Sequence, residues 1–162
     1  MIINPSLPGG HVIFCDDIRH EQHGKVTFVG AYSGTMFVNG SLPTTLPKLC
    51  MGIVYREEPD SLEPVTIKVT MPNEEDETLI ASFEMHPQAD MIPPPSDEFT
   101  FREARFLFEA PNFTIPHEGT VLVRAYRGDD EIRLGRLNIV LNPEAEQQIP
   151  QLGDAEAIDQ SQ

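Results

Sequence analysis

Alternation of apolar and polar side chains with a period of two runs through most of this sequence and limits its fold more than any other feature. The clearest example is PVTIKVTM, in which Val65, Ile67, Val69 and Met71 alternate with polar residues. A half-buried antiparallel strand requires this pattern, because successive side chains point to opposite faces of a sheet. The pattern predicts a strand over 65–71 whose four apolar side chains face the core.

Seven further runs share this β-rich character and are separated by turn signals. The run LIASFEMH, which comes next, has Leu79, Ala81, Phe83 and Met85 in the inward positions. In the phenylalanine-rich run the inward parity changes near 103–105, which predicts a bulge there. The other predicted strands are 11–20, 25–32, 47–56, 99–109, 120–127 and 131–141. The run 47–56 is apolar on both faces, which predicts a central strand covered on two sides.

Fifteen prolines fall mainly between these runs, where they limit edge pairing and stiffen turns. About eight strands with such turns predict an all-β fold, a single antiparallel β-sandwich of the immunoglobulin-like or C2-like kind, with a closed barrel as the alternative. The segment TMFV (35–38) could add a short strand. The domain is predicted to span 1–142 and to be followed by a disordered acidic tail over 143–162.

The formal net charge of −15 is distributed unevenly along the chain. Residues 57–109 hold fourteen acids and three bases, and 143–162 hold five acids and no base, whereas 1–56 and 110–142 are almost neutral. An acidic surface repels phosphate, so we expect no direct binding to nucleic acid. The neutral segments are the better places to look for an interface.

The two cysteines, Cys15 and Cys50, lie far apart in apolar runs, where free thiols behave as small hydrophobes. The N-terminus has no basic, apolar leader, and nowhere do eighteen apolar residues run together. These features predict a cytoplasmic protein that makes no contact with membranes. There is no nucleophile motif and no phosphate-binding glycine loop, so we expect neither an enzyme nor a cofactor.

Acidic residues are predicted to gather at one end of the sandwich. If each strand crosses it once, the loops 57–63, 87–98 and 128–131 lie together, joined by the turn 20–24 if residues 33–46 make no extra crossing. Carboxylates from several loops suit calcium, which takes six to eight oxygen ligands, and the two histidines of that turn have a spacing that zinc sites use. Solvated acidic loops are the simpler interpretation. The candidate metal ligands are Glu57, Glu58, Asp60, Asp97, Glu98, Asp129, Asp130, His20 and His23.

Two adjacent carboxylates, Asp16 and Asp17, end an apolar strand and would point to opposite faces of it. We expect one of them to bond to the backbone at a bulge or to pair with Arg19 or Lys25, because a partly buried charge needs a partner. General acid/base catalysis would need a second carboxylate held opposite in a cleft. A structural role is therefore favoured for both residues.

The stretch CDDIRHEQHGKVTFVGAY indicates a first hairpin with a salt-linked strand end and a strained turn at Gly24. Together with the LPKL segment before the next strand, it resembles the opening of an uncharacterised family of small bacterial and phage-associated proteins, a domain of unknown function. The later FTIPHEGTVLVRAYRGDDEIRLGRLNIVL resembles the terminal hairpin of many immunoglobulin-like sandwiches. The resemblance implies an intracellular β-sandwich and brings no established activity. The matching positions are Cys15, Asp16, Asp17, Ile18, Arg19, Glu21, Gly24, Lys25, Gly30 and Tyr32.

These observations favour a non-enzymatic interaction or structural module. It would offer a sandwich face, a strand edge or a loop end to a protein partner or to a second copy of itself. A loop-end domain for calcium or a small polar ligand is the alternative. A hydrolase built on Asp16 or Asp17 and an acidic inhibitor of nucleic-acid-binding proteins are weaker candidates.

Overall fold

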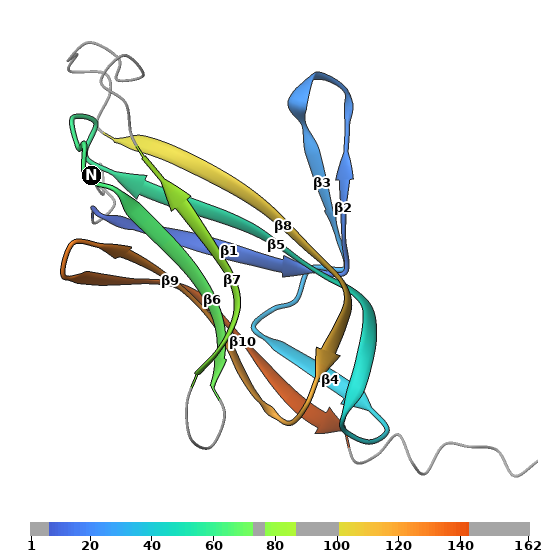
Figure 1. Ribbon diagram of the computed structural model, residues 1–162. Coiled ribbons are helices and arrows are strands. Elements are labelled where there is room, and N and C mark those ends of the chain that lie inside the picture. Colours follow the sequence, from blue (N-terminus) through green and yellow to red (C-terminus); the bar gives the residue numbers. More distant parts are fainter. Residues whose placement is uncertain (1–6, 73–76, 87–100, 143–162) are drawn as a thin grey trace, which may run out of the picture.

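The computed structural model describes residues 7–72, 77–86 and 101–142. These residues form ten strands and one short 3-10 turn, Gln22–Gly24 (Figure 1). The predicted all-β fold class is therefore confirmed. The strands are β1 (Gly9–Cys15), β2 (Asp17–His20), β3 (Val26–Val29), β4 (Thr35–Asn39), β5 (Thr44–Glu57), β6 (Val65–Pro72), β7 (Glu77–Met85), β8 (Arg102–Ile115), β9 (Gly119–Arg127) and β10 (Asp130–Asn142).

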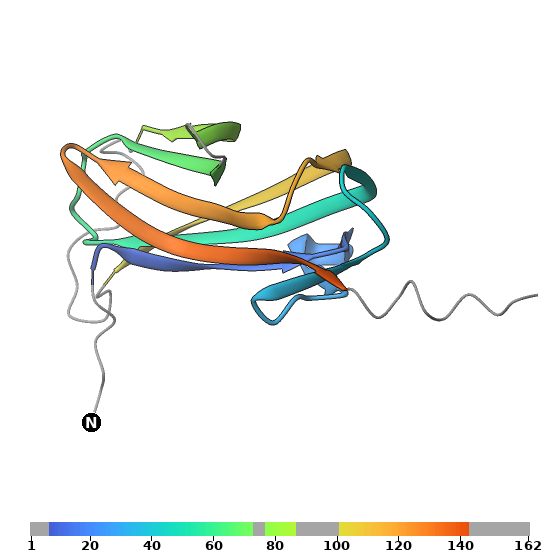
Figure 2. The ribbon, with the colours of Figure 1, turned by 90° about the horizontal axis from the view of Figure 1, so that it is seen from below.

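Two larger sheets face each other and a separate hairpin stands beside them (Figures 1 and 2). Five strands pair in the order β4-β10-β9-β6-β7, three pair in the order β1-β5-β8, and β2 pairs with β3. One core of buried side chains joins the two larger sheets, with Met51 and Ile53 from β5 packing among Ile67 from β6 and Val123 from β9. The arrangement is the predicted β-sandwich.

Two strands match their predictions closely. All four predicted inward side chains of β6, from Val65 to Met71, are buried. In β5 the five residues 49–53 are buried without a break, because its inner face packs on the opposite sheet and its outer face lies beneath the hairpin. The prediction of a central strand covered on both sides is thereby confirmed.

The chain has ten described strands instead of about eight for two local reasons. The run 11–20 breaks at Asp16, so that β1 stays in the sandwich and pairs with β5 while β2 leaves it to pair with β3. The segment TMFV forms β4, which lies parallel to the end of β10. This parallel pair is the exception to the predicted antiparallel arrangement.

Side-chain parity differs from its prediction in β7 and β8. In β7 an extra residue opposite the Val69–Thr70 step makes a bulge, which turns Leu79 outward (55 % exposed) and packs Ile80 against the core instead. The bulge predicted near 103–105 is wrong, because the register of β8 with β5 continues through those residues. The inward positions of β8 change parity later, at Asn112, whose φ is +53°.

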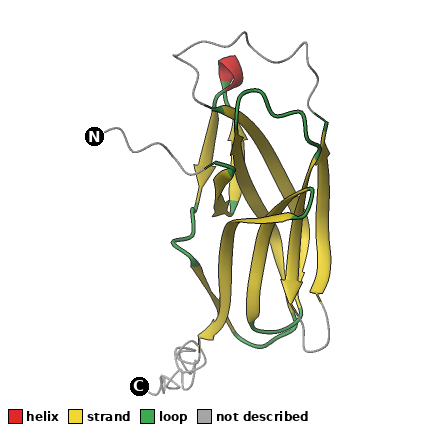
Figure 3. Cartoon of the chain, turned by 90° about the vertical axis from the view of Figure 1, so that its left-hand side faces the viewer, coloured by secondary structure: helices red, strands yellow, loops and turns green. Residues whose placement is uncertain are grey.

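The first predicted turn is confirmed at the tip of the β2–β3 hairpin. Figure 3 shows the 3-10 turn at this tip in red. His23 and Gly24 both have positive φ there, +61° and +71°. The tight turn between β9 and β10 is formed in the same way at Gly128, whose φ is +56°.

Candidate functional site

The predicted loop-end metal ligands are only partly brought together, and arginines already pair with two of them. The carboxylate of Glu57 is buried (1 % exposed) and accepts hydrogen bonds from Arg102 Nε at 3.1 Å and the Tyr55 hydroxyl at 3.4 Å. Glu58 pairs with Arg127 Nη1 at 2.8 Å, which holds the pKa of this carboxyl below its usual value. Of the other candidates, Asp60, Asp129 and Asp130 are exposed, and Asp97 and Glu98 lie outside the described residues, as does the predicted tail.

The two candidate histidines do not join these acids. The chain leaves the sandwich at Asp16, and the turn 20–24 is carried away with the hairpin (Figure 1). His20 instead lies beside the middle of β8, with Nε2 3.6 Å from a carboxylate oxygen of Glu109, and His23 is exposed at the hairpin tip. Calcium binding at the loop end was the alternative interpretation, and it would now rest on the acids alone.

The root of the hairpin, where β2 and β3 meet the sandwich, is held by contacts of Asp16. Its carboxylate accepts a hydrogen bond from the Tyr32 hydroxyl, and its N–H donates to the Val29 carbonyl at 3.0 Å. Gly30 has a φ of +66°, and a Cβ at this position would lie 2.1 Å from a carboxylate oxygen of Asp16, so only glycine fits. The Tyr32 N–H donates to the Phe14 carbonyl at 2.8 Å and ties the hairpin back to β1. The partner of the Asp16 carboxylate is thus Tyr32, whereas the sequence suggested the backbone, Arg19 or Lys25.

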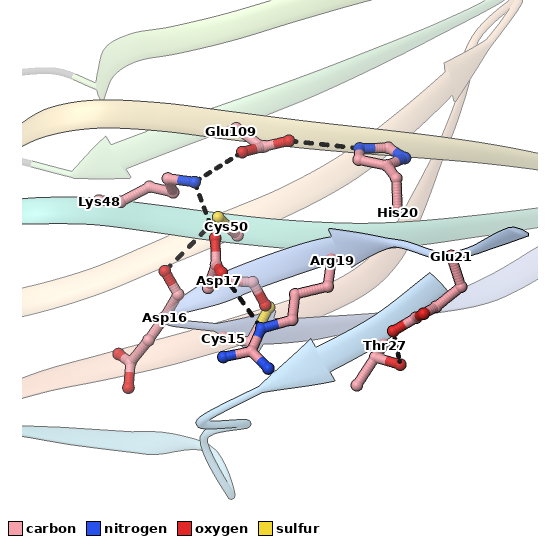
Figure 4. Close-up of polar contacts among 10 residues, drawn as sticks. All are labelled: Cys15, Asp16, Asp17, Arg19, His20, Glu21, Thr27, Lys48, Cys50 and Glu109. Atoms are coloured by element: carbon pink, nitrogen blue, oxygen red, sulfur yellow. Dashed lines mark hydrogen bonds and ion pairs between the residues drawn. The ribbon is translucent and has the colours of Figure 1, made fainter. Parts of the chain in front are cut away.

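Asp17 belongs to a chain of ion pairs that crosses three strands (Figure 4). Lys48 Nζ on β5 lies 2.8 Å from Asp17 on β2 and 2.9 Å from Glu109 on β8, and His20 approaches Glu109 from its other side. The hydrogen bonds from Lys48 lower the pKa of both carboxyl groups and raise the pKa of the lysine. The predicted partner Arg19 is only a marginal one, at 3.9 Å between exposed side chains. The ion pairs orient the hairpin on the sheet.

Two of these carboxylates also form the one group among the described residues whose side chains resemble a metal site. Ligand atoms of Asp17, Cys50 and Glu109 lie within 4.8 Å of one another. The ammonium of Lys48, however, already bonds to both carboxylates. Burial raises the pKa of the Cys50 thiol, and a protonated thiol is a poor metal ligand. The two carboxylates of this cluster are therefore best described as ion-pair partners of Lys48 that connect the hairpin to the sheet.

The apolar face of the hairpin packs on the outer face of the three-stranded sheet. Ile18 is buried there with Cys15 and Cys50, whose thiols are free and buried, as the sequence predicts. Burial and the neighbouring Cys50 thiol raise the pKa of Cys15 to about 11. The ring of Phe28 lies directly over Gly52 of β5, where a Cβ would come within 2.4 Å of the ring. Glycine inside a strand often marks such a close approach, so the run LCMGIV carried a signal for this contact.

Beside Phe28 the sheet is left open, and a groove of about 200 Å³ runs between the hairpin and the outer face of β1, β5 and β8. Its floor is largely apolar because Gly52 is flanked in register by Ile13 on β1 and Leu107 on β8. Leu107 is 40 % exposed within it. The residues that line it are His11, Ile13, Val26, Phe28, Gly52, Ile53, Val54, Arg56, Glu103, Arg105, Phe106 and Leu107.

Charged side chains rim the groove, and they are paired with one another. Glu103 accepts hydrogen bonds from Arg105 Nε at 2.6 Å and Arg56 Nε at 2.8 Å, which lower its pKa. The guanidinium of Arg56 also lies over the ring of Phe101, 5.4 Å from its centre. The rim therefore places two arginines and one glutamate around an apolar floor. Sequence reasoning missed this site because its walls come from four separate strands.

Fold and site together define a β-sandwich domain with an accessory hairpin held over one sheet. Residues 11–140 match the model of a family described as "Family of unknown function (DUF6941)", and the chain belongs to this family. The expectation of an uncharacterised family is thereby confirmed. A search of curated proteins found no match. Among residues 7–72, 77–86 and 101–142, no helix is long and apolar enough to cross a membrane.

Proposed function

We propose that this domain is a non-enzymatic protein-interaction module and that it binds an apolar segment of a partner protein in the groove beside the hairpin. The observation that supports this proposal most strongly is the exposure of Leu107 between apolar walls formed by Phe28 and Val54. Burying exposed apolar area contributes roughly 25 cal/mol per Å². A partner side chain placed against Leu107 would gain from this burial without rearranging the sheet.

The polar groups at the root of the hairpin and on the rim of the groove support a binding role over a catalytic one. Lys48 is shared between Asp17 and Glu109, and Glu103 is held by two arginines. A general acid or base needs a proton-transfer group that is free to meet a substrate. The observed pairing instead suits groups that fix the hairpin and shape the rim.

The charge of the chain indicates which partners are favoured. A net charge of −15 attracts basic proteins at long range and accelerates their association at low salt. The free, buried thiols fit a reducing compartment such as the cytoplasm, and the resemblance of the opening motif implies a bacterial or phage-associated setting. We therefore propose a cytoplasmic partner that combines a basic surface with an apolar contact segment.

The test replaces one side chain in the groove and one outside it. Leu107→Arg puts a charge on the apolar floor, and Leu79→Arg, at a side chain of similar exposure on β7 of the other sheet, is the matched control. Both sites are exposed, so each variant should unfold within about 0.5 kcal/mol of the wild type. The wild type and both variants serve as baits in lysate of the native host, and any retained protein is then purified and titrated against all three.

We expect a partner that binds the wild type and the Leu79→Arg control equally and binds Leu107→Arg about tenfold more weakly or worse. Its binding should also weaken as salt is raised, because the attraction between opposite net charges is screened. A partner that all three baits retain with equal affinity would place the interface elsewhere and overturn the groove as the binding site.

A further inference from the structure

β4 presents an open strand edge that is independent of the hairpin groove. It lies at the end of the five-stranded sheet, beside the last residues of β10 (Figure 2), and pairs with no other described strand. The Asn138 N–H donates to the Gly34 carbonyl at 3.0 Å. Alternate residues of a parallel strand face the same neighbour. Thr35, Phe37 and Asn39 therefore direct their N–H and C=O groups away from β10.

An apolar patch accompanies this edge. Phe37 is 67 % exposed, more than any other exposed large apolar side chain among the described residues. It lies directly opposite Val140 of β10, which is 37 % exposed. An uncovered aromatic ring beside unpaired backbone groups is the combination that strand edges normally avoid.

The charge pattern indicates what covers this edge. Native edge strands are usually guarded by charged residues, and β7 at the other end of this sheet carries Glu77 and Glu84. The residues 35–39 (TMFVN) and 138–142 (NIVLN) contain no charge. In a chain of net charge −15, two copies repel each other over most of their surface. Among the described residues, the uncharged β4 edge is where a second copy can approach without facing a row of acids.

We propose that β4 pairs antiparallel with β4 of a second copy, across a two-fold axis at Phe37, and joins two five-stranded sheets into one. Antiparallel pairing centred on this residue makes Phe37 exchange both backbone hydrogen bonds with Phe37 of the second copy, and sets Thr35 opposite Asn39. These are the residues whose backbone groups face outward. The rings of the two Phe37 side chains and the neighbouring Val140 side chains form the apolar contact.

The geometry determines how such a dimer behaves. A strand of five residues makes a small interface, which belongs to the weak, concentration-dependent class. Raising the salt concentration should strengthen it, because salt screens the repulsion between two acidic chains. This response is opposite in sign to that expected for a basic partner in the hairpin groove, so failure of one proposal is distinguishable from failure of the other.

The experiment measures the mass of the full chain by sedimentation equilibrium over rising protein concentration, at low and high salt. We expect the mass to rise from 18.1 kDa toward twice that value, and to rise further at high salt. Phe37→Glu should weaken association by about tenfold or more. Leu79→Glu, a similarly exposed position on β7, should leave it unchanged. Thermal melting of both variants checks that they fold.

Hydrogen exchange in the wild type gives a second measurement that needs no variant. The amides of Thr35, Phe37 and Asn39 should exchange more slowly as protein concentration rises, while those of Met36 and Val38, already directed at β10, should not change. A mass that stays at 18.1 kDa up to on the order of 1 mM protein would overturn the proposal. So would a dimer that Phe37→Glu leaves as stable as in the wild type.

Discussion

Replacing Gly52 by alanine tests the contact that seats the hairpin on the sheet. The new Cβ would lie 2.4 and 2.5 Å from two ring carbons of Phe28, whereas carbon atoms in contact prefer about 3.5 to 4.0 Å. The ring would have to retreat by about 1 Å. Overpacking of this kind costs about 1 to 3 kcal/mol, less a gain of about 0.5 to 1 kcal/mol from replacing a flexible glycine inside a strand. We expect Gly52→Ala to lower the free energy of unfolding by about 1 to 2 kcal/mol.

A double-mutant cycle identifies the steric cause. Phe28→Leu alone should cost about 1 kcal/mol, because it removes part of a partly buried ring. In the double variant the smaller side chain makes room for the new methyl group, so the combined cost should be smaller than the two single costs added together, by about 1 kcal/mol. Urea unfolding midpoints, with the slope m unchanged, give these free energies.

Gly119→Ala is the matched control, because a Cβ there would meet its nearest neighbours at 3.5 and 3.6 Å, which is ordinary contact. It should be neutral or slightly stabilising. If Gly52→Ala proves equally harmless, or if its cost adds fully to that of Phe28→Leu, the account of how the hairpin is seated is refuted.

Four further outcomes follow from the structure. The pKa values of Asp17 and Glu109 are lower in the folded chain than usual. The two ionised carboxylates therefore contribute fully to stability above about pH 5, and this contribution is lost as the pH falls through the lowered pKa values. In Asp17→Asn the urea midpoint should decline less steeply between about pH 4 and pH 2 than in the wild type. Tyr32→Phe removes the hydrogen bond to Asp16 and should cost about 1 to 2 kcal/mol in the same assay. Both cysteine thiols are buried, so they should react slowly with a disulfide reagent at neutral pH and rapidly in urea, and fast native labelling would contradict the packing. Because arginines already pair with two of the loop-end carboxylates, millimolar calcium should not raise the melting temperature, and a clear rise would restore the calcium hypothesis.

The sequence predicted the fold class because the alternation of apolar and polar residues indicates which face of a strand is buried. This local pattern was enough to predict the buried faces of β6 and β5. Alternation did not predict where β7 slips, because the bulge at Ile80 depends on the register with β6. The two carboxylates of Asp16 and Asp17 suggested a strand end with a bulge. They did not show that β2 leaves the sandwich, because residues of β character flank them on both sides. β2 leaves the sandwich where Asp16 bonds to the Tyr32 hydroxyl and packs against Gly30.

The candidate site was less predictable than the fold. The pairing of Asp17 with Lys48 joins residues thirty-one positions apart, and charge pattern alone pointed to the sequence neighbours Arg19 and Lys25. Predicting the groove would require the pairing registers of β1, β5 and β8 and the position of the hairpin. Leu107 and Ile13 lie on either side of Gly52 only because of these registers. The neutrality of the segments 1–56 and 110–142 was readable from composition, and these segments hold the β4 edge.

Methyl NMR of the full chain, alone and with the partner captured through the wild-type bait, tests the central proposal most directly. If the hairpin groove binds the partner, the methyl signals of Ile13, Val54 and Leu107 should shift on binding, and those of Leu79 on the opposite sheet should not. Binding that leaves the three groove signals unchanged and shifts methyl groups elsewhere would contradict the proposal.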